Sequence, residues 1–556
     1  MHVRPRLWPM RLAACLTTAA FLLYLLVWGC PHYDLCDDVI LMDAFFGAVG
    51  GTAESFTSCM LAPLTWILYA LGRMAPGVAW FSVYQAALLA ASGYTVVYSG
   101  MLLCRRLRAP VWLGWLAGTA MAWIFVVSVS NFITFTQTAA AAGMAAVWRA
   151  AAIDWRARDR FGALAGSICL LACAFCLRWE SALPACCFYL GVLLCAGLVE
   201  GMPIRPLLAG AAACLAALGL IGGIRAADIA LSGEAEYERW QSARVRVMDY
   251  GALAYVDDAV LEAAGWTESM LEAVRSWCML DASVTAEAFD TVARAAQGKD
   301  FSLGEALGRV QTLFAKYRRI YWVGALMLLL SGFAFCGLKG WGRAASACCA
   351  LSAAALMFFL AARGRLPMRA ATSVLWPACA VSAYLALLGG ERALRNGHKY
   401  LCALGALACA VVLLPNARQA LANTYQPYPM ERESVYTRVE RYALEHPEQL
   451  VIGTGALGRD PRLFPDRSQG VPDNLLLAWG GWNNHSKGYR AVMARFGYED
   501  GFRMADFAGG NVVLAAAAGE QPPPFLIACI QEQTGRAPRW DAQAYDGFTI
   551  YRFNLP

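Results

Sequence analysis

Eleven long stretches of apolar residues constrain this chain more than any other feature. A helix that crosses a bilayer needs about 20 predominantly apolar residues. The stretches run at 11–29, 80–103, 110–128, 132–148, 161–177, 182–199, 206–225, 321–338, 343–362, 371–389 and 399–415. The 556-residue chain is accordingly 59% hydrophobic and only 15% charged, with a mean hydropathy of +0.45. These values predict an α-helical polytopic membrane protein of about 11 transmembrane helices, and they exclude a disordered, fibrous or nucleic-acid-binding chain.

The positions of the basic residues predict how the chain is oriented. Loops on the cytoplasmic side of a membrane are enriched in lysine and arginine. With a cytoplasmic N-terminus, the basic residues at 105–108, 149–160, 339–343 and 392–399 all fall in inner loops. Eleven crossings then place the C-terminus outside. One outer loop opposes this rule because it carries Arg363, Arg365 and Arg369.

Three segments on the predicted outer side are too long to be simple connections. They are a loop at about 30–79, a loop at about 226–320, and the tail. Residues 66–71 of the first are expected to lie in the membrane interface, and helices at 259–274 and 286–296 of the second on the membrane surface. We therefore divide the chain into a transmembrane domain, 1–415, and an extracytoplasmic domain, 416–556.

The tail has the pattern of an α/β domain of ordinary size. Short apolar runs bounded by turn residues predict strands, and charged amphipathic runs predict helices. The expected strands are 450–453, 511–514 and 548–553, and the expected helices are 431–445, 489–496 and 525–533.

Two adjacent acids follow the first apolar stretch. Asp37 and Asp38 lie just past its predicted outer end. Neighbouring carboxylates repel, so one of them tends to keep a proton or to bind a cation. The pair would suit a general base or a divalent metal such as Mg²⁺ or Mn²⁺. The alternative is that Asp38 is the N-cap of a helix over 39–46.

Charged side chains elsewhere suggest a phosphate site. The guanidinium groups of Arg363, Arg365 and Arg369 match phosphate geometry, and a phosphate at this surface most simply belongs to a lipid. Arg178 and Glu180, at the end of the fifth stretch, would form either an internal ion pair or part of a polar cavity, and the ion pair is favoured.

Two further motifs have alternative interpretations. The sequence Gly-Gly-Trp-Asn-Asn-His at 480–485 would suit sugar binding, although a turn with a core tryptophan is favoured,. Cys30, Cys36 and Cys59 flank one outer loop, and their spacing leaves any disulfide pairing open.

Motifs for soluble cofactors are absent from the sequence. It contains neither a Walker A motif nor a G-x-G-x-x-G motif after a strand, and its five histidines are scattered without metal-ligand spacing,. These features exclude the usual ATPase and dinucleotide sites.

Several patches resemble a group of bacterial membrane proteins that is similar to the GT-C glycosyltransferases. The patches are 37–48, 63–69, 76–81, 238–250, 264–270, 364–369 and 476–482. The resemblance implies a sugar donor carried on a polyprenyl phosphate or diphosphate, an acid of the first outer loop at Asp37 or Asp38, and a phosphate-binding arginine at 363, 365 or 369. It also implies a location in the bacterial plasma membrane and a soluble outer domain.

The sequence as a whole favours a membrane glycosyltransferase that uses a polyprenyl-phosphate-linked sugar and a cell-envelope glycan or protein as acceptor. Asp37 or Asp38 would be the catalytic base, and Arg178, Glu180 and the three loop arginines would bind substrate. The alternatives are a transporter or flippase of lipid-linked glycans and a non-enzymatic glycan-binding membrane protein. The sequence leaves open the sugar, the acceptor, the metal requirement and the oligomeric state.

Overall fold

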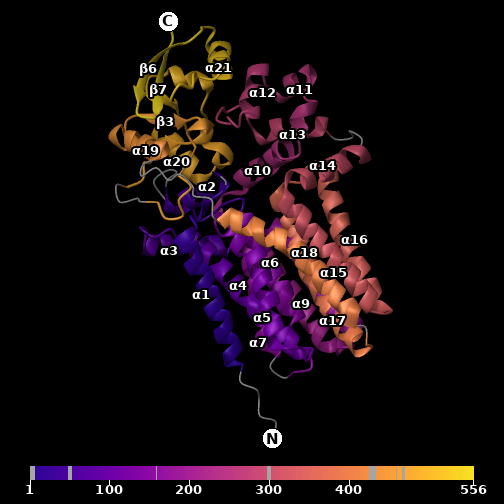
Figure 1. The fold of residues 1–556 in the computed structure, drawn as a ribbon. Coiled ribbons are helices and arrows are strands. Elements are labelled where there is room, and N and C mark those ends of the chain that lie inside the picture. The colour runs from indigo at the N-terminus through magenta and orange to yellow at the C-terminus, as the bar shows by residue number, and fades with distance from the viewer. Residues whose placement is uncertain are drawn as a thin grey trace.

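The long helices form one bundle, and a mixed helix and sheet region covers one of its ends (Figure 1). The computed structural model describes residues 7–34, 36–47, 53–157, 160–296, 302–397, 399–424, 434–458, 460–465 and 470–556. The C-terminus lies in the covering region, whereas the N-terminal helix α1 begins at the opposite end of the bundle. We refer to the covered end as the domain end.

Every predicted apolar stretch coincides with a helix. These helices are α1 (Trp8–Trp28), α4 (Trp80–Arg106), α5 (Val111–Phe125), α6 (Phe135–Ala151), α7 (Arg160–Leu177), α8 (Trp179–Leu198), α9 (Ile204–Ser232), α15 (Arg318–Gly337), α16 (Trp341–Ala362), α17 (Met368–Arg395) and α18 (Lys399–Thr424). In the described part of the chain, ten helices are long and apolar enough to span a membrane. The predicted fold class, a polytopic helical membrane protein with a C-terminal α/β domain, is confirmed.

Helix α6, which is not among these ten, is short and lies inside the bundle. It has 17 residues, of which Ala139–Ala142 are fully buried. It begins three residues later than the predicted stretch because the Thr134 hydroxyl caps it, accepting a hydrogen bond from the Gln137 backbone N–H at 3.1 Å,. Small side chains let the helices approach closely. Glycines likewise let α4 and α5 pack closely, because a Cβ on Gly114 would lie 2.3 Å from the Gly100 carbonyl oxygen.

The first long connection folds against the domain end of the bundle. It contains β1 (His32–Tyr33), α2 (Cys36–Phe46) and α3 (Leu64–Met74), and β1 pairs in parallel with β2 (Phe132–Ile133). Helix α2 starts at Cys36, so Asp37 and Asp38 both lie in its first turn. The interpretation of Asp38 as an N-cap is therefore wrong. Acidic side chains in a first turn are stabilised by the helix dipole.

The second long connection does not lie apart as a surface layer. It forms α10 (Ala235–Met248), α11 (Asp258–Ala264), α12 (Glu268–Arg275), α13 (Ala286–Ala295) and α14 (Leu303–Lys316). Apolar residues of α10, α12 and α13 share one buried cluster with the C-terminal domain. The stretch predicted at 259–274 is divided into α11 and α12 by Gly265, whose backbone is left-handed, and the helix predicted at 286–296 is α13. Their apolar faces pack on protein and not on a membrane surface, which buries their apolar side chains,.

The C-terminal domain is a five-stranded sheet with helices on both faces. Its elements are α19 (Val435–Glu445), β3 (Leu450–Gly453), β4 (Leu475–Leu476), α20 (Lys487–Arg495), β5 (Val512–Ala517), α21 (Pro524–Thr534), β6 (Arg539–Tyr545) and β7 (Phe548–Asn554). The strand order is β4-β3-β5-β7-β6, parallel from β4 to β5 and antiparallel afterwards. The predicted strands and helices of the tail are present. Strands β4 and β6 were not predicted: β4 has only two residues, and β6 is an exposed edge strand in which Trp540 and two alanines are the only apolar residues that alternate with polar ones.

Candidate active site

Asp37 lies where three distant parts of the chain meet. Its carboxylate oxygen Oδ2 is 3.4 Å from a terminal nitrogen of Arg369, in the first turn of α17. The other oxygen, Oδ1, accepts a hydrogen bond from the indole N–H of Trp482 at 3.2 Å. Both members of the Asp37–Arg369 pair are 28% exposed, so solvent reaches them. The structure thus brings the acid of the first connection together with one arginine of the 363–369 segment.

Asp38 points the other way and is fully buried. Its Oδ1 atom accepts hydrogen bonds from the Phe135 backbone N–H at 2.7 Å and from the Gln85 amide at 3.3 Å. Its Oδ2 atom is buried without a hydrogen-bond partner among the described residues. Burial raises the pKa of Asp38 well above its usual range, and the charge of Asp37 adds to this effect,. Asp38 therefore anchors the start of α6, and only Asp37 is accessible.

Substitutions at Asp38 are expected to affect stability. Asp38→Ala removes the acceptor of the Phe135 N–H and should lower the free energy of unfolding by about 1–3 kcal/mol, because a buried donor is left unpaired. Asp38→Asn keeps that acceptor and resembles the protonated acid, so it should retain near-normal stability and transfer. Thermal unfolding of the purified variants checks this, and an equal loss in both variants would contradict it.

The other two arginines of the segment contact the residues that follow α10. Arg365 forms an ion pair with Asp249 at 2.6 Å. The guanidinium group of Arg363 lies over the ring of Tyr250, 5.9 Å from its centroid. The connection between α16 and α17 is therefore held against the end of α10, and this contact places Arg369 beside Asp37.

Arg178 and Glu180 form the expected ion pair, 3.2 Å between Nε and Oε2, at the start of α8. Arg178 also lies over the ring of Phe135, 5.1 Å from the centroid. The thiol of Cys59 lies nearby: burial raises its pKa, and Arg178, Asp37 and Glu180 act on it electrostatically. Cys30 and Cys59 are free thiols, and the side chain of Cys36 lies outside the described residues.

Trp482 belongs to the Gly480–His485 motif, and the structure favours the turn interpretation. The side chain is only 6% exposed and packs in the core of the bundle, so its ring is not available to stack on a sugar. The turn has left-handed backbone at Ala478, Trp479 and His485, which is strained for these residue types,. The Trp482 carbonyl accepts hydrogen bonds from Tyr237 at 3.3 Å and from Gln241. The motif thus aims the indole N–H at Asp37.

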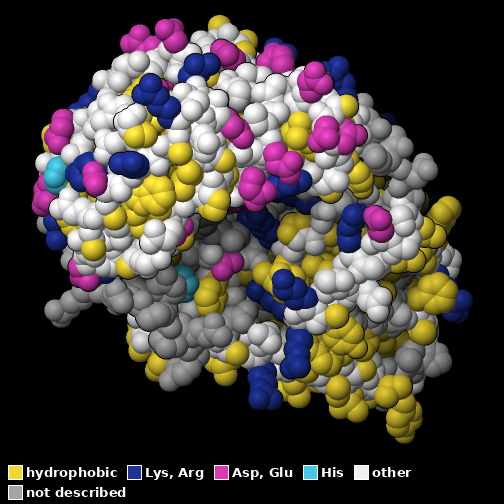
Figure 2. Space-filling model, turned by 90° about the horizontal axis from the view of Figure 1, so that it is seen from above, with side chains coloured by type: hydrophobic (Ala, Val, Ile, Leu, Met, Phe, Trp, Pro, Cys, Tyr) yellow, Lys and Arg dark blue, Asp and Glu magenta, His cyan; other side chains and the backbone are white. Residues whose placement is uncertain are grey.

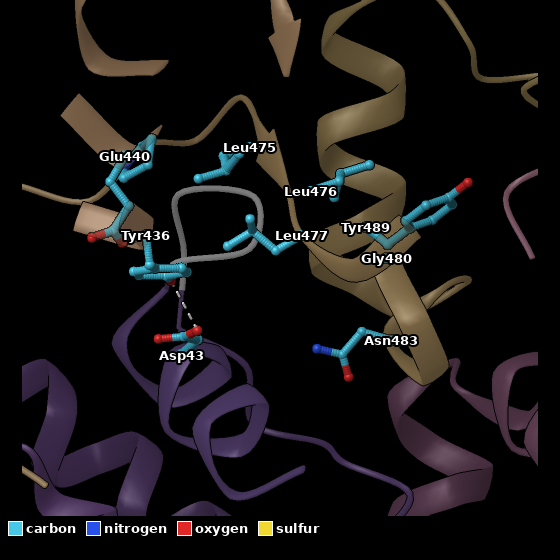
Figure 3. Close-up of a pocket in the computed structure, with 10 residues that line it drawn as sticks. Asp43, Tyr436, Glu440, Leu475, Leu476, Leu477, Gly480, Asn483 and Tyr489 are labelled. Atoms are coloured by element: carbon cyan, nitrogen blue, oxygen red, sulfur yellow. Dashed lines mark hydrogen bonds between the residues drawn. The ribbon is translucent and has the colours of Figure 1, made fainter. Parts of the chain in front are cut away.

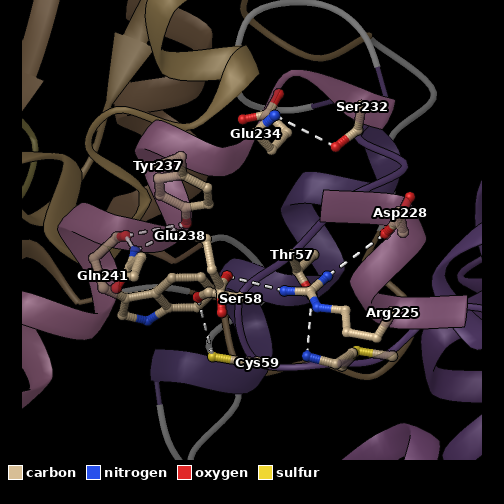
Figure 4. Close-up of polar contacts among 12 residues, drawn as sticks. Thr57, Ser58, Cys59, Arg225, Asp228, Ser232, Glu234, Tyr237, Glu238 and Gln241 are labelled. Atoms are coloured by element: carbon tan, nitrogen blue, oxygen red, sulfur yellow. Dashed lines mark hydrogen bonds and ion pairs between the residues drawn. The ribbon is translucent and has the colours of Figure 1, made fainter. Parts of the chain in front are cut away.

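A cluster of buried charges fixes α10, which carries Tyr237 and Gln241 (Figure 4). Arg225 of α9 forms ion pairs with Glu238 at 3.0 Å and with Asp228 at 3.6 Å. It also lies 4.0 Å from the ring centroid of Phe56, in the first long connection. Asp228 accepts a further hydrogen bond from the indole of Trp66 at 3.0 Å. Breaking such a buried network is costly, so α10 has a defined place relative to Asp37.

Seen from the domain end, lysine and arginine side chains gather around a hollow near the middle of the view, with a few acidic side chains beside them (Figure 2). A separate small pocket lies between α2, α19 and the C-terminal sheet (Figure 3). Its lining includes Asp43, which accepts a hydrogen bond from Tyr436 at 3.2 Å, and Asn483. This pocket does not include Asp37 or Arg369.

The acidic pair does not form a metal site in this arrangement. In the part of the chain that the structure describes, no three His, Cys, Asp or Glu side chains are grouped to hold a metal ion. Asp37 is engaged by Arg369 and Trp482, while Asp38 faces the interior. These residues do not fit the Mg²⁺ or Mn²⁺ site considered from the sequence, and we derive no step through a metal.

Glu54 joins the first connection to the C-terminal domain. It is buried and accepts hydrogen bonds from the Ser486 hydroxyl at 2.8 Å and from the Gly488 backbone N–H at 3.0 Å, at the start of α20. Burial, with a smaller contribution from the nearby charge of Glu234, raises the pKa of Glu54 to about 7. The folded protein therefore binds this proton more tightly than the unfolded chain does.

This difference predicts a pH-dependent stability. Because the folded pKa lies above the unfolded one, the contribution of Glu54 is present below about pH 4.5 and is lost as the pH rises to about 7,. The loss amounts to about 3 kcal/mol. Glu54→Gln should flatten the decline of the unfolding midpoint between pH 5 and pH 8, whereas Glu236→Gln, an exposed acid of α10, should leave it unchanged. Equal slopes in wild type and Glu54→Gln would contradict this assignment.

No family model matches the sequence, and no curated protein matches it.

Three solved structures, each 12% identical, are similar to this chain. Archaeal oligosaccharyltransferase AglB from Archaeoglobus fulgidus, in complex with an inhibitory peptide and a dolichol-phosphate, aligns over 98% of this chain and 74% of its own, with a TM-score of 0.43. Arabinofuranosyltransferase AftD from Mycobacteria aligns over 98% and 40%, with a TM-score of 0.45. ArnT from Cupriavidus metallidurans, bound to undecaprenyl phosphate, aligns over 96% and 97%, with a TM-score of 0.34. These are distant likenesses of fold.

Proposed function

We propose that this chain is a membrane glycosyltransferase that transfers a sugar from a polyprenyl-phosphate donor to an acceptor of the cell envelope. One observation carries the proposal: Asp37 and Arg369, 332 positions apart, meet at the domain end of the bundle in a pair that solvent reaches. A carboxylate beside a guanidinium group supplies the two functions that transfer from a lipid phosphate needs, a proton acceptor and a stabiliser of the leaving phosphate.

The proposed step balances without an external co-reactant. Asp37 takes the proton of an acceptor hydroxyl, and the oxygen of that hydroxyl attacks the anomeric carbon of the donor sugar. The bond between that carbon and the phosphate oxygen breaks with inversion, and the lipid phosphate leaves with the electron pair. Arg369 neutralises the charge that develops on the departing phosphate, where a fixed cation contributes most.

The resting contacts of Asp37 fit this role. A phosphate that binds to Arg369 competes with Asp37 for the same guanidinium nitrogen, so donor binding frees Oδ2 to accept a proton,. Trp482 keeps hold of Oδ1 and fixes the direction of the carboxylate. The proposed orientation has the N-terminus in the cytoplasm and the domain end at the outer face of a bacterial plasma membrane, which agrees with the distribution of basic loops.

The test is a turnover assay with the purified full-length protein in nanodiscs. A panel of polyprenyl-phosphate sugars is offered together with cell-envelope glycan or protein acceptors, and sugar transfer and release of the lipid phosphate are followed. Transfer that depends on Asp37 supports the proposal. Movement of the intact lipid-linked sugar between leaflets of proteoliposomes, without any transfer, would instead establish the transporter alternative.

A further inference from the structure

Arg244 differs from the other arginines of α10. Arg239 and Arg246 are exposed and form ion pairs with Glu287 and Asp290 of α13. Arg244, on the opposite side of the helix, is only 7% exposed. A helix with three arginines thus buries one of them, and burying a charged side chain is costly unless it is paired.

The described structure provides Arg244 with no counter-ion. Its Nε atom donates a hydrogen bond to the Gln241 amide oxygen at 2.9 Å, and its guanidinium group lies over the ring of Trp277, 5.5 Å from the centroid. No carboxylate of the described residues lies within ion-pair distance. Asp249, the acid that acts on it most strongly, is already held by Arg365 at 2.6 Å. The two terminal nitrogens of Arg244 therefore have no protein acceptor among the described residues.

A chain of hydrogen bonds joins Arg244 to the Asp37–Arg369 pair. Asp37, Cys59 and Tyr237 are further electrostatic neighbours of Arg244, and burial lowers its pKa. Gln241, which accepts from Arg244, also donates to the carbonyl of Trp482, the residue that holds Asp37. Arg244 is therefore joined to Asp37 through two hydrogen-bonded residues, Gln241 and Trp482.

The charges around the site are unbalanced. Five guanidinium groups lie at or beside it, those of Arg178, Arg244, Arg363, Arg365 and Arg369. They face four carboxylates: those of Asp37, Glu180 and Asp249 in ion pairs, and that of Asp34, on which Arg369 acts electrostatically. A sugar joined to a polyprenol by one phosphate is a diester with a single negative charge. Such a donor bound at Arg369 balances the remaining charge there, whereas Arg244 has no ion-pair partner of its own among the described residues.

We propose that Arg244 forms a second anion subsite, which binds a phosphoryl or carboxylate group of the substrates in addition to the phosphate at Arg369. This inference rests on the proposed function. The anionic group has two sources: the second phosphoryl group of a diphosphate-linked donor, or an acidic group on the acceptor. In both cases the free fork of the guanidinium group binds two oxygens of the anion, with Trp277 packed on its face.

The test measures binding to the full-length protein in detergent, with farnesyl phosphate and farnesyl diphosphate as probes. Arg244→Gln should weaken farnesyl diphosphate about tenfold, the effect of one charge-assisted contact, and should leave farnesyl phosphate nearly unchanged. Arg369→Gln should weaken both probes. Arg239→Gln, which removes an exposed arginine of the same helix, is the matched control and should weaken neither.

A second arm distinguishes the acceptor as the source. Glucuronate and glycerol phosphate are titrated into protein saturated with farnesyl phosphate. A loss of their binding in Arg244→Gln, with both farnesyl probes unaffected, assigns the subsite to an acidic acceptor. If wild type binds no farnesyl probe, the proposed function fails, and titration of the same soluble anions without the lipid still reports on Arg244. The inference is overturned if Arg244→Gln matches Arg239→Gln with every probe.

A folding defect is separated from a binding defect by Arg244→Lys. Lysine keeps the charge but cannot bind two oxygens as a fork. It should therefore recover part of the lost affinity while its thermal midpoint stays close to that of Arg244→Gln. Recovery of affinity that follows only the recovery of the thermal midpoint would reduce Arg244 to a structural residue and overturn the subsite.

Discussion

Asp37→Asn is expected to lower sugar transfer by about 10²–10⁴-fold, because an amide cannot accept the proton of the acceptor hydroxyl. Asparagine keeps the shape of the side chain and can still accept the hydrogen bond of Trp482, so folding should be preserved. The measurement is the single-turnover rate of the purified variant with a donor that wild type uses, together with its thermal midpoint.

Two matched variants make the result specific to Asp37. Asp38→Asn changes the neighbouring buried acid, and Asp500→Asn changes an exposed acid of the C-terminal domain. Both should retain transfer. A wild-type rate in Asp37→Asn would remove the base from the proposed step, and equal losses at residues 37 and 38 would indicate a shared electrostatic role.

Arg369→Gln is expected to lower the turnover number by about 10²–10³-fold, since the leaving phosphate would lose the cation that stabilises its developing charge. The substrate concentration at half-maximal rate should change less than the turnover number does, because the contact strengthens as the bond breaks. Arg369→Lys should recover part of the rate, and Arg275→Gln, an exposed arginine of α12, should have none of the effect.

The Asp37→Asn and Arg369→Gln losses should not add. The two side chains act on the same transferred group and contact each other at 3.4 Å, so a double variant should be little worse than the poorer single variant,. Strictly additive losses would show that the two residues act in separate steps.

The sequence predicts the bundle well because each apolar stretch is long enough to demand a helix in a bilayer. It predicts helix ends less well, since these depend on single caps such as Thr134 at the start of α6. The placement of the helices at 258–275 and 286–295 against the C-terminal sheet could not be predicted, because an amphipathic pattern shows that an apolar face needs a partner but does not identify that partner.

The candidate site was also predictable from the sequence only in part. The adjacent acids and the misplaced arginine cluster were visible in the sequence, yet nothing local distinguishes Asp37 from Asp38. Gln85 and the Phe135 N–H, which bury Asp38, come from two other helices. Arg244 was missed because α10 is rich in charges and its three arginines are equivalent in the sequence; only the packed structure shows which of them lacks a carboxylate.

The union of residues 235–295 with residues 450–553 of the tail in one core has a consequence for biosynthesis. The ribosome delivers Asp37 early, Arg369 after most of the spans, and Trp482 almost last. A nascent chain therefore lacks the complete set of contacts around Asp37, the proposed base, until Trp482 has emerged and docked. On the proposed function, transfer would begin only when insertion is complete, so half-assembled copies of the protein would not consume lipid-linked sugars.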